Sequence, residues 1–260
     1  MINNEINFDE LSKTYINNKP FKHIIIDNFL DIDLAKKLSF EFPDHNKDFW
    51  LKYNNPIEKK LLYNKIDENI PFSIKNLLLE LNKKSFLKLI SKLTKIDNLI
   101  SDPDFHGGGM HCIKNGGKLD VHIDYSIHPS LNLERRINLI LYLNQNWANE
   151  YGGCLELWDK KMTKCEKKIA PLFNRAVIFN TGDSSYHGHP EPLKCPSDVS
   201  RKSLAWYFLT TPQEKATKRY KARFVARPND PKNKEIEDFR VKRSTIDSAS
   251  DLYQTDDEED

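Results

Sequence analysis

The fold of this chain is decided by a stretch that begins with Leu119-Asp120-Val121-His122-Ile123-Asp124-Tyr125 and ends near Tyr207. In a β-strand, residues two apart project from the same face. His122 and Asp124 therefore point together if this run is a strand, and Ile123 turns away into packing. A second histidine, His187, follows more than sixty residues later.

These residue types are those of a metal site. Two imidazoles and one carboxylate on one side of an iron ion, with open positions on the other side, are the ligand set of non-haem Fe(II) oxygenases. His122 and Asp124 supply one group of each kind. The third ligand must come from a strand adjacent in space, and His187 and His189 are both available on one strand face.

A site for an anionic cosubstrate would need a fixed cation at the far end of that molecule. Arg201 supplies a planar donor fork for a carboxylate, and Ser203, two residues along the same strand, can add a hydroxyl. Tyr142 could hydrogen-bond the cosubstrate, although a plain core tyrosine is an equally good interpretation. Asn138 is a weaker candidate for the same hydrogen bond to the cosubstrate.

The region around these residues predicts a mainly β fold. Seven or eight strand-like segments occur within about a hundred residues, separated by Gly, Asn and Pro turns. Asn138–Asn144 is the clearest of them, and Asn115-Gly116-Gly117 predicts a tight turn that joins two short strands. A sandwich or barrel fits this pattern, and a double-sheet jelly roll fits it best.

The N-terminal part predicts supporting helices. Phe21–Leu30 has the β-branched run of a buried strand, and Asp31 or Asp33 can cap a helix that follows it. Residues 45–70 show little periodicity and are expected to form a loop. From residue 72 to 99, apolar residues recur at helical spacing, which predicts two amphipathic helices packed on a sheet as its outer layer.

The composition excludes several classes of protein. The 260 residues are 38% hydrophobic and 30% charged, with a net charge of +2 that favours neither nucleic acid nor an anionic membrane as partner. The four cysteines are scattered without a Cys-x-x-Cys pair, which argues against a structural zinc site or a disulfide framework. The first residues lack a secretory profile, and no apolar run is long enough to cross a bilayer. We expect a soluble, cytoplasmic protein.

The ordered set of residues resembles the 2-oxoglutarate/Fe(II)-dependent oxygenases, specifically the branch related to prolyl 4-hydroxylases. The resemblance rests on His122-x-Asp124, the distal His187 and Arg201-x-Ser203, and it extends from about residue 20 to about residue 228. The surrounding motifs that share it are Gly107-Gly108-Gly109-Met110-His111, Gly116-Gly117-x-Leu119, Arg135-Arg136-Ile137-Asn138-Leu139, Tyr142-Leu143-Asn144, Gly152-Gly153-x-Leu155-Glu156-Leu157-Trp158 and Tyr186-His187-Gly188-His189-Pro190.

The resemblance implies a double-stranded β-helix (jelly roll) core with flanking α-helices. It also implies Fe(II) held by His122, Asp124 and His187, with 2-oxoglutarate bound through its far carboxylate to Arg201, O2 as cosubstrate, and ascorbate as a candidate additional requirement. His187 is preferred to His189 because it follows a serine after a strand, as the distal ligand of this family does. His189 would then orient substrate or donate a hydrogen bond beside the site.

The implied reaction is hydroxylation of an unactivated C–H bond, with release of succinate and CO2. Because Asp124 is present, hydroxylation is expected and halogenation is not. Well-known prolyl 4-hydroxylases carry lysine where this chain has Arg201, so a prolyl substrate does not follow from the resemblance. A peptidyl residue and a small metabolite both remain open as substrates. Two other hypotheses are a jelly-roll module that keeps the metal and only binds a ligand, and a cupin-type metal enzyme without 2-oxoglutarate.

The chain divides into three parts on this interpretation. Residues 1–19 are an N-terminal extension, and residues 20–228 are the oxygenase domain. Within that domain, residues 20–100 are mainly helical support and residues 101–212 are the jelly-roll core. Residues 229–260 are charged, poor in large apolar side chains, and expected to be disordered.

Overall fold

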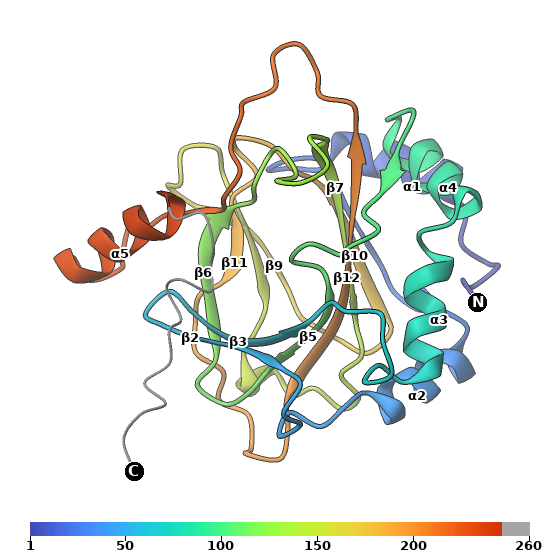
Figure 1. Ribbon diagram of the computed structural model, residues 1–260, viewed down its shortest axis with the longest axis horizontal. Helices are drawn as coiled ribbons and strands as arrows, with labels where there is room; N and C mark the ends of the chain where they lie inside the picture. Colours follow the sequence, from blue (N-terminus) through green and yellow to red (C-terminus); the bar gives the residue numbers. More distant parts are fainter. Residues whose placement is uncertain (246–260) are drawn as a thin grey trace.

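The computed structural model describes residues 1–245, and its centre is one strongly curled antiparallel sheet (Figure 1). The strands in the described residues are β1 His23–Ile26, β2 Leu51–Asn54, β3 Glu58–Tyr63, β4 Ile100–Ser101, β5 Gly109–Ile113, β6 Lys118–Ile123, β7 Glu134–Tyr142, β8 Leu155–Trp158, β9 Cys165–Ile169, β10 Arg175–Asn180, β11 His187–His189, β12 Arg201–Thr210 and β13 Arg223–Phe224. The helices there are α1 Phe8–Asn17, α2 Ile32–Glu41, α3 Phe72–Glu80, α4 Lys84–Thr94, α5 Lys234–Thr245 and the 3-10 helix η1 Asn149–Tyr151.

The strand order is β1-β10-β7-β12-β5-β3-β6-β11-β8-β9, with β2, β4 and β13 attached at the sides. The half that contains β7 and β12 and the half that contains β6, β11 and β8 both contribute side chains to one central cavity. Two sheet halves that face each other across a cavity are the arrangement of a jelly roll. The predicted mainly β fold is therefore confirmed.

Side chains alternate between two faces along β7 and β12, the longest strands of the sheet. One face is apolar and packs against the helices, whereas the other faces the cavity and carries polar groups. The residues on the helix face are Leu139, Leu141, Leu204, Trp206 and Phe208. The residues on the cavity face are Asn138, Ile140, Arg201, Ser203 and Tyr207.

Helices α1 to α4 gather on the outer face of this half of the sheet (Figure 1). Of the two predicted caps of α2, the structure has Asp31, whose Oδ1 accepts hydrogen bonds from the amides of Asp33 and Leu34. Helices α3 and α4 confirm the two amphipathic helices expected between residues 72 and 99. The helix α1 packs against α4, so the N-terminal residues belong to the helical layer.

The prediction of a loop at residues 45–70 was wrong, because strands β2 and β3 form a hairpin there. Its turn depends on Asn55, whose side-chain oxygen accepts hydrogen bonds from the amides of Ile57 and Glu58. Strand β2 is short and mostly exposed, so it carries no apolar period that the sequence could reveal.

The tight turn at Asn115-Gly116-Gly117 is present, and Gly116 adopts a positive φ of 73°. The two strands that it joins, β5 and β6, do not pair with each other as the strands of a hairpin would. Both pair with β3 instead, through Cys112 opposite Leu61 and Leu119 opposite Glu58. The hairpin from residues 51–63 therefore links the two halves of the sheet.

The expected disorder from residue 229 onward was wrong for residues 234–245, which form α5. The buried guanidinium of Arg240 donates a hydrogen bond of 2.8 Å to the buried carboxylate of Asp120 on β6. A helix attached by charged contacts has no apolar stripe, so its composition resembles that of a disordered segment. The acidic end of the chain, residues 246–260, lies outside the described residues.

Among residues 1–245, no helix has both the length and the apolar character that a membrane crossing requires.

The helical layer and the sheet are joined by Trp206, which is fully buried and donates a hydrogen bond from Nε1 to the carbonyl of Leu78 on α3. We expect Trp206→Ala to lower the free energy of unfolding by about 3–5 kcal/mol, because it leaves a large cavity. Phe40→Ala, at an aromatic side chain 89% exposed, should change it by no more than about 0.5 kcal/mol. Urea denaturation measures both, and equal losses would contradict this packing.

Candidate metal centre and cosubstrate pocket

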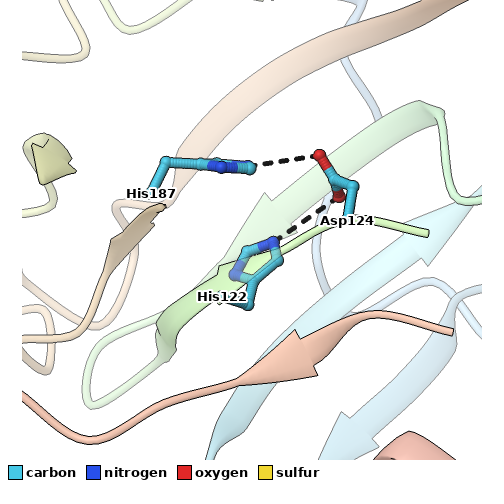
Figure 2. A group of neighbouring side chains, drawn as sticks. All are labelled: His122, Asp124 and His187. Atoms are coloured by element: carbon cyan, nitrogen blue, oxygen red, sulfur yellow. Dashed lines mark ion pairs between the residues drawn. The ribbon is translucent and has the colours of Figure 1, made fainter. Parts of the chain in front are cut away.

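Strand pairing brings the two histidines of the candidate metal centre together. His122 lies in β6, and Asp124 follows directly after the last residue of that strand. His187 begins β11 and stands directly opposite His122 in the antiparallel register. Val121 and Ile123 are fully buried on the other face of β6, so the alternation predicted for this run is present. Figure 2 shows the three side chains pointing toward one another.

The three side chains are buried and close enough to share one ion. Their ligand atoms all lie within 4.8 Å of one another. Nε2 of His122 is 3.7 Å from one carboxylate oxygen of Asp124, and Nε2 of His187 is 3.5 Å from the other (Figure 2). Within the described residues these three form the only such group of potential ligands. His189 is not part of it.

The backbone fixes which imidazole nitrogen is free to bind a metal. Nδ1 of His122 lies 2.9 Å from the carbonyl of Asp120, and Nδ1 of His187 lies 2.8 Å from the carbonyl of Ser185. A carbonyl only accepts hydrogen bonds, so both Nδ1 atoms carry the proton and both Nε2 atoms present a lone pair. Metal-binding histidines are commonly oriented by this kind of contact.

The carboxylate of Asp124 is held by two donors. Its Oδ2 accepts hydrogen bonds from Asn138 Nδ2 at 2.8 Å and lies 3.1 Å from a guanidinium nitrogen of Arg135. Burial alone would raise the pKa of Asp124, but Arg135 and the two histidines outweigh burial and hold it well below its usual range. The group is therefore an ionised ligand.

Arg135 is itself fixed by a buried polar and aromatic environment. Its guanidinium lies 3.3 Å from the ring centroid of Tyr207 and 4.7 Å from that of Tyr125, and its Nε donates to Asn138. Sequence reasoning gave Arg135 no role at the metal. The contact arises because the segment after Asp124 returns to β7, and nothing in the local sequence reveals that return.

This donor set suits a borderline divalent metal such as Fe(II). Two imidazole nitrogens and one carboxylate oxygen on one side leave other coordination positions open toward the cavity. The cavity has a volume of about 430 Å³ and is bounded by side chains from both halves of the sheet. His122, Asp124 and His187 line it together with Arg201 and Ser203.

Arg201 is a buried cation with an oriented guanidinium group. Its Nε donates to the carbonyl of Gly153 at 2.9 Å, and one terminal nitrogen donates to the Tyr142 hydroxyl at 3.2 Å. A Cβ at Gly153 would lie 3.0 Å from the Arg201 side chain, so the glycine leaves room for it. Within residues 1–245 Arg201 forms no salt bridge. A buried charge of this kind calls for an anion in the cavity.

The three other residues predicted to bind the cosubstrate, Ser203, Tyr142 and Asn138, have different surroundings in the structure. Ser203 lines the cavity two residues along β12 from Arg201. Tyr142 is fully buried, and its hydroxyl accepts a hydrogen bond from Arg201 and so helps to orient the guanidinium. Asn138, to which the sequence gave little weight, reaches the carboxylate of Asp124.

The C-terminal segment completes one wall of the pocket. Strand β13 pairs with β6, and the Phe224 ring lies over His122 with 5.0 Å between ring centroids. Arg219 donates from Nε to the backbone carbonyl of Asp124. The sequence offers no periodic pattern for this segment, so its place beside the metal centre was missed.

Comparison with known proteins agrees with this geometry. Residues 108–209 match the model of the 2OG-Fe(II) oxygenase superfamily. This range includes His122, Asp124, His187 and Arg201. This part of the chain, about two fifths of its length, is similar to that superfamily. The two histidines and one aspartate fit Fe(II), and the buried Arg201 fits the anionic 2-oxoglutarate, the two groups for which this superfamily is named.

Two curated relatives are prolyl 3-hydroxylases. The chain is 26% identical over 225 residues to mouse prolyl 3-hydroxylase OGFOD1, an alignment that covers 84% of this chain and 38% of the mouse protein. It is 32% identical over 72 residues to prolyl 3-hydroxylase sudestada1 of Drosophila melanogaster, covering 24% of this chain and 13% of that protein. The chain thus spans well under half the length of these relatives.

Solved structures share the fold. A prolyl hydroxylase of Trichoplax adhaerens, in complex with a peptide of the hypoxia inducible factor oxygen degradation domain, superposes with a TM-score of 0.55 at 21% identity, covering 78% of this chain and 90% of that one. A prolyl-4-hydroxylase of Pseudomonas putida gives a TM-score of 0.54 at 16% identity, covering 78% and 99%.

The buried histidines of the pocket predict acid sensitivity of the metal-free protein. Burial lowers the pKa of His187 to about 4, and burial together with Arg201 lowers that of His189 well below its usual value. The unfolded chain, with histidine pKa values of about 6.5, therefore binds more protons than the folded chain below that pH. Stability should fall as the pH falls from about 6.5 toward 4, by up to about 1.4 kcal/mol per pH unit for each histidine.

Urea denaturation of the metal-free protein at several pH values checks this expectation. Replacing both histidines with glutamine should make the free energy of unfolding depend less on pH, because glutamine does not titrate. A free energy of unfolding that is equally pH-dependent in the wild type and the double variant would contradict the assignment of the effect to these two side chains.

Proposed function

We propose that this chain is a 2-oxoglutarate- and O2-dependent Fe(II) dioxygenase that hydroxylates a C–H bond of a peptidyl residue, with release of succinate and CO2. One observation carries the proposal. Arg201 is buried, has no salt-bridge partner among residues 1–245, and shares a cavity with a group of two histidines and one aspartate. A cation and a metal site in one enclosed space fit an anion that binds to both.

The contacts of the metal-centre residues indicate which atom of each would bind the metal. His122 and His187 would hold the metal through Nε2, and Asp124 would hold it through its carboxylate. Asn138 and Arg135 keep that carboxylate ionised and oriented, so no rearrangement is needed when the metal binds. The bound metal supplies activation of O2, which protein side chains cannot provide.

Arg201 would bind the far carboxylate of 2-oxoglutarate through its guanidinium, whose direction is set by Tyr142 and Gly153. The Ser203 hydroxyl is available on the same wall of the cavity. Ile140 also lines the cavity and is apolar, which strengthens the ion pair by limiting its contact with water.

A peptidyl proline is the substrate class that we favour. The mouse relative is named a prolyl 3-hydroxylase, and the first structural relative binds a peptide. In this chain the cavity is lined by the aromatic rings of Tyr125, Tyr207, Tyr220 and Phe224. Aromatic grooves recognise proline-containing segments, because flat rings pack against the rigid pyrrolidine ring.

Removal of the arginine side chain tests the proposal. In the presence of Fe(II), the wild-type protein should slowly convert 2-oxoglutarate and O2 to succinate even without a peptide. Arg201→Ala should raise the KM for 2-oxoglutarate at least about 30-fold, since truncating one partner of a buried charge pair costs about 2 kcal/mol or more. Arg175→Ala, at a guanidinium paired with Asp27 outside the cavity, is the matched control and should leave the KM unchanged.

Two results would count against the proposal. A wild-type protein with a full complement of Fe(II) and no succinate formation would indicate a module that binds a ligand without turnover. Succinate formation with the same KM in Arg201→Ala would remove Arg201 as the cosubstrate clamp. Thermal unfolding of each variant shows whether a lost activity reflects a lost fold.

A further inference from the structure

The imidazole of His189 lines the pocket but belongs to neither the metal group nor the contacts of Arg201. It is only 4% exposed, and within residues 1–245 neither of its ring nitrogens has a hydrogen-bond partner. The neighbouring His122 and His187, by contrast, each bind a backbone carbonyl through Nδ1. A buried polar group without a partner is costly and calls for an explanation.

His189 and Arg201 line the same cavity. His189 lies two residues after His187 on β11, and Ser203 lines that cavity as well. Burial, and after it the charge of Arg201, hold the pKa of His189 well below its usual value. Both side chains thus line one enclosed space, His189 from β11 and Arg201 from β12.

Packing alone does not account for a histidine here. An apolar residue of similar size would fill the space without burying two polar nitrogens. The imidazole also adds nothing to the metal group, because the ligand atoms that lie together are those of His122, Asp124 and His187. A neutral imidazole has one N–H donor and one acceptor, so an anion beside Arg201 would satisfy the donor.

We propose that His189 is a positioning residue for the cosubstrate, and that its N–H donates a hydrogen bond to the far carboxylate of 2-oxoglutarate beside the guanidinium of Arg201. The inference rests on the proposed function. It adds a second donor from the opposite half of the sheet, since His189 belongs to β11 and Arg201 belongs to β12. The far carboxylate would then be held from both walls.

A carboxylate held from two walls is recognised more selectively than one held by a single cation. A 2-oxo acid that lacks the far carboxylate can still reach the metal through its keto-acid end, but it leaves the donors of Arg201 and His189 unpaired. The contribution of His189 is therefore expected in the binding of 2-oxoglutarate and not in the binding of 2-oxobutanoate.

Calorimetric titration of the protein loaded with Mn(II), under anaerobic conditions, measures the affinity for 2-oxoglutarate and for 2-oxobutanoate without relying on turnover. His189→Leu should weaken 2-oxoglutarate binding about 10-fold, in line with loss of one hydrogen bond to a charged group. The same variant should bind 2-oxobutanoate as the wild type does. His189→Gln keeps an N–H donor and should recover part of the affinity for 2-oxoglutarate.

The outcomes distinguish this inference from the proposed function. If wild-type protein with bound Mn(II) does not bind 2-oxoglutarate, the proposed function fails, and this inference fails with it. If the wild type binds it and His189→Leu binds it equally well, only the role of His189 is overturned. Equal weakening of both ligands in His189→Leu would place its effect at the metal or the fold and would also overturn that role.

Discussion

The pairing of β6 with β11 is the constraint on which the rest of the site depends. It sets His122 directly opposite His187, and the period of the strand adds Asp124 to the same face. A shift of this register by one residue would turn one of the histidines away from the cavity. The backbone thus fixes the metal group before any metal binds, and the carbonyl contacts of both Nδ1 atoms fix the ring orientations.

The second requirement is that a cation from the other half of the sheet faces this group. Arg201 comes from β12, whose outer face packs on the helices through residues such as Trp206. The hairpin of β2 and β3 connects the two halves through pairing with both β5 and β6. The helical layer and the hairpin therefore act on function indirectly, because they hold the two walls of the cavity at a fixed separation.

The sequence predicted what depends on local geometry. The two-residue spacing of His122 and Asp124, the helices at residues 72–99 and the mainly β core all follow from periodicity. What it could not supply depends on contacts between distant segments. Arg135 reaches Asp124 only after the chain returns to β7, and α5 is attached by an ion pair of Arg240 without any apolar stripe. Spacing alone left both His187 and His189 open as the third metal ligand, and the resemblance to the 2-oxoglutarate/Fe(II)-dependent oxygenases favoured His187.

The central claim is that one ion binds to two strands of this sheet and faces Arg201. A crystal structure of the protein with Mn(II) and 2-oxoglutarate, with the metal located by its anomalous scattering, tests it most directly. We expect a single strong peak about 2.0–2.3 Å from Nε2 of His122, a carboxylate oxygen of Asp124 and Nε2 of His187. A metal bound through His189 in place of His187, or a 2-oxoglutarate molecule directed away from Arg201, would contradict it.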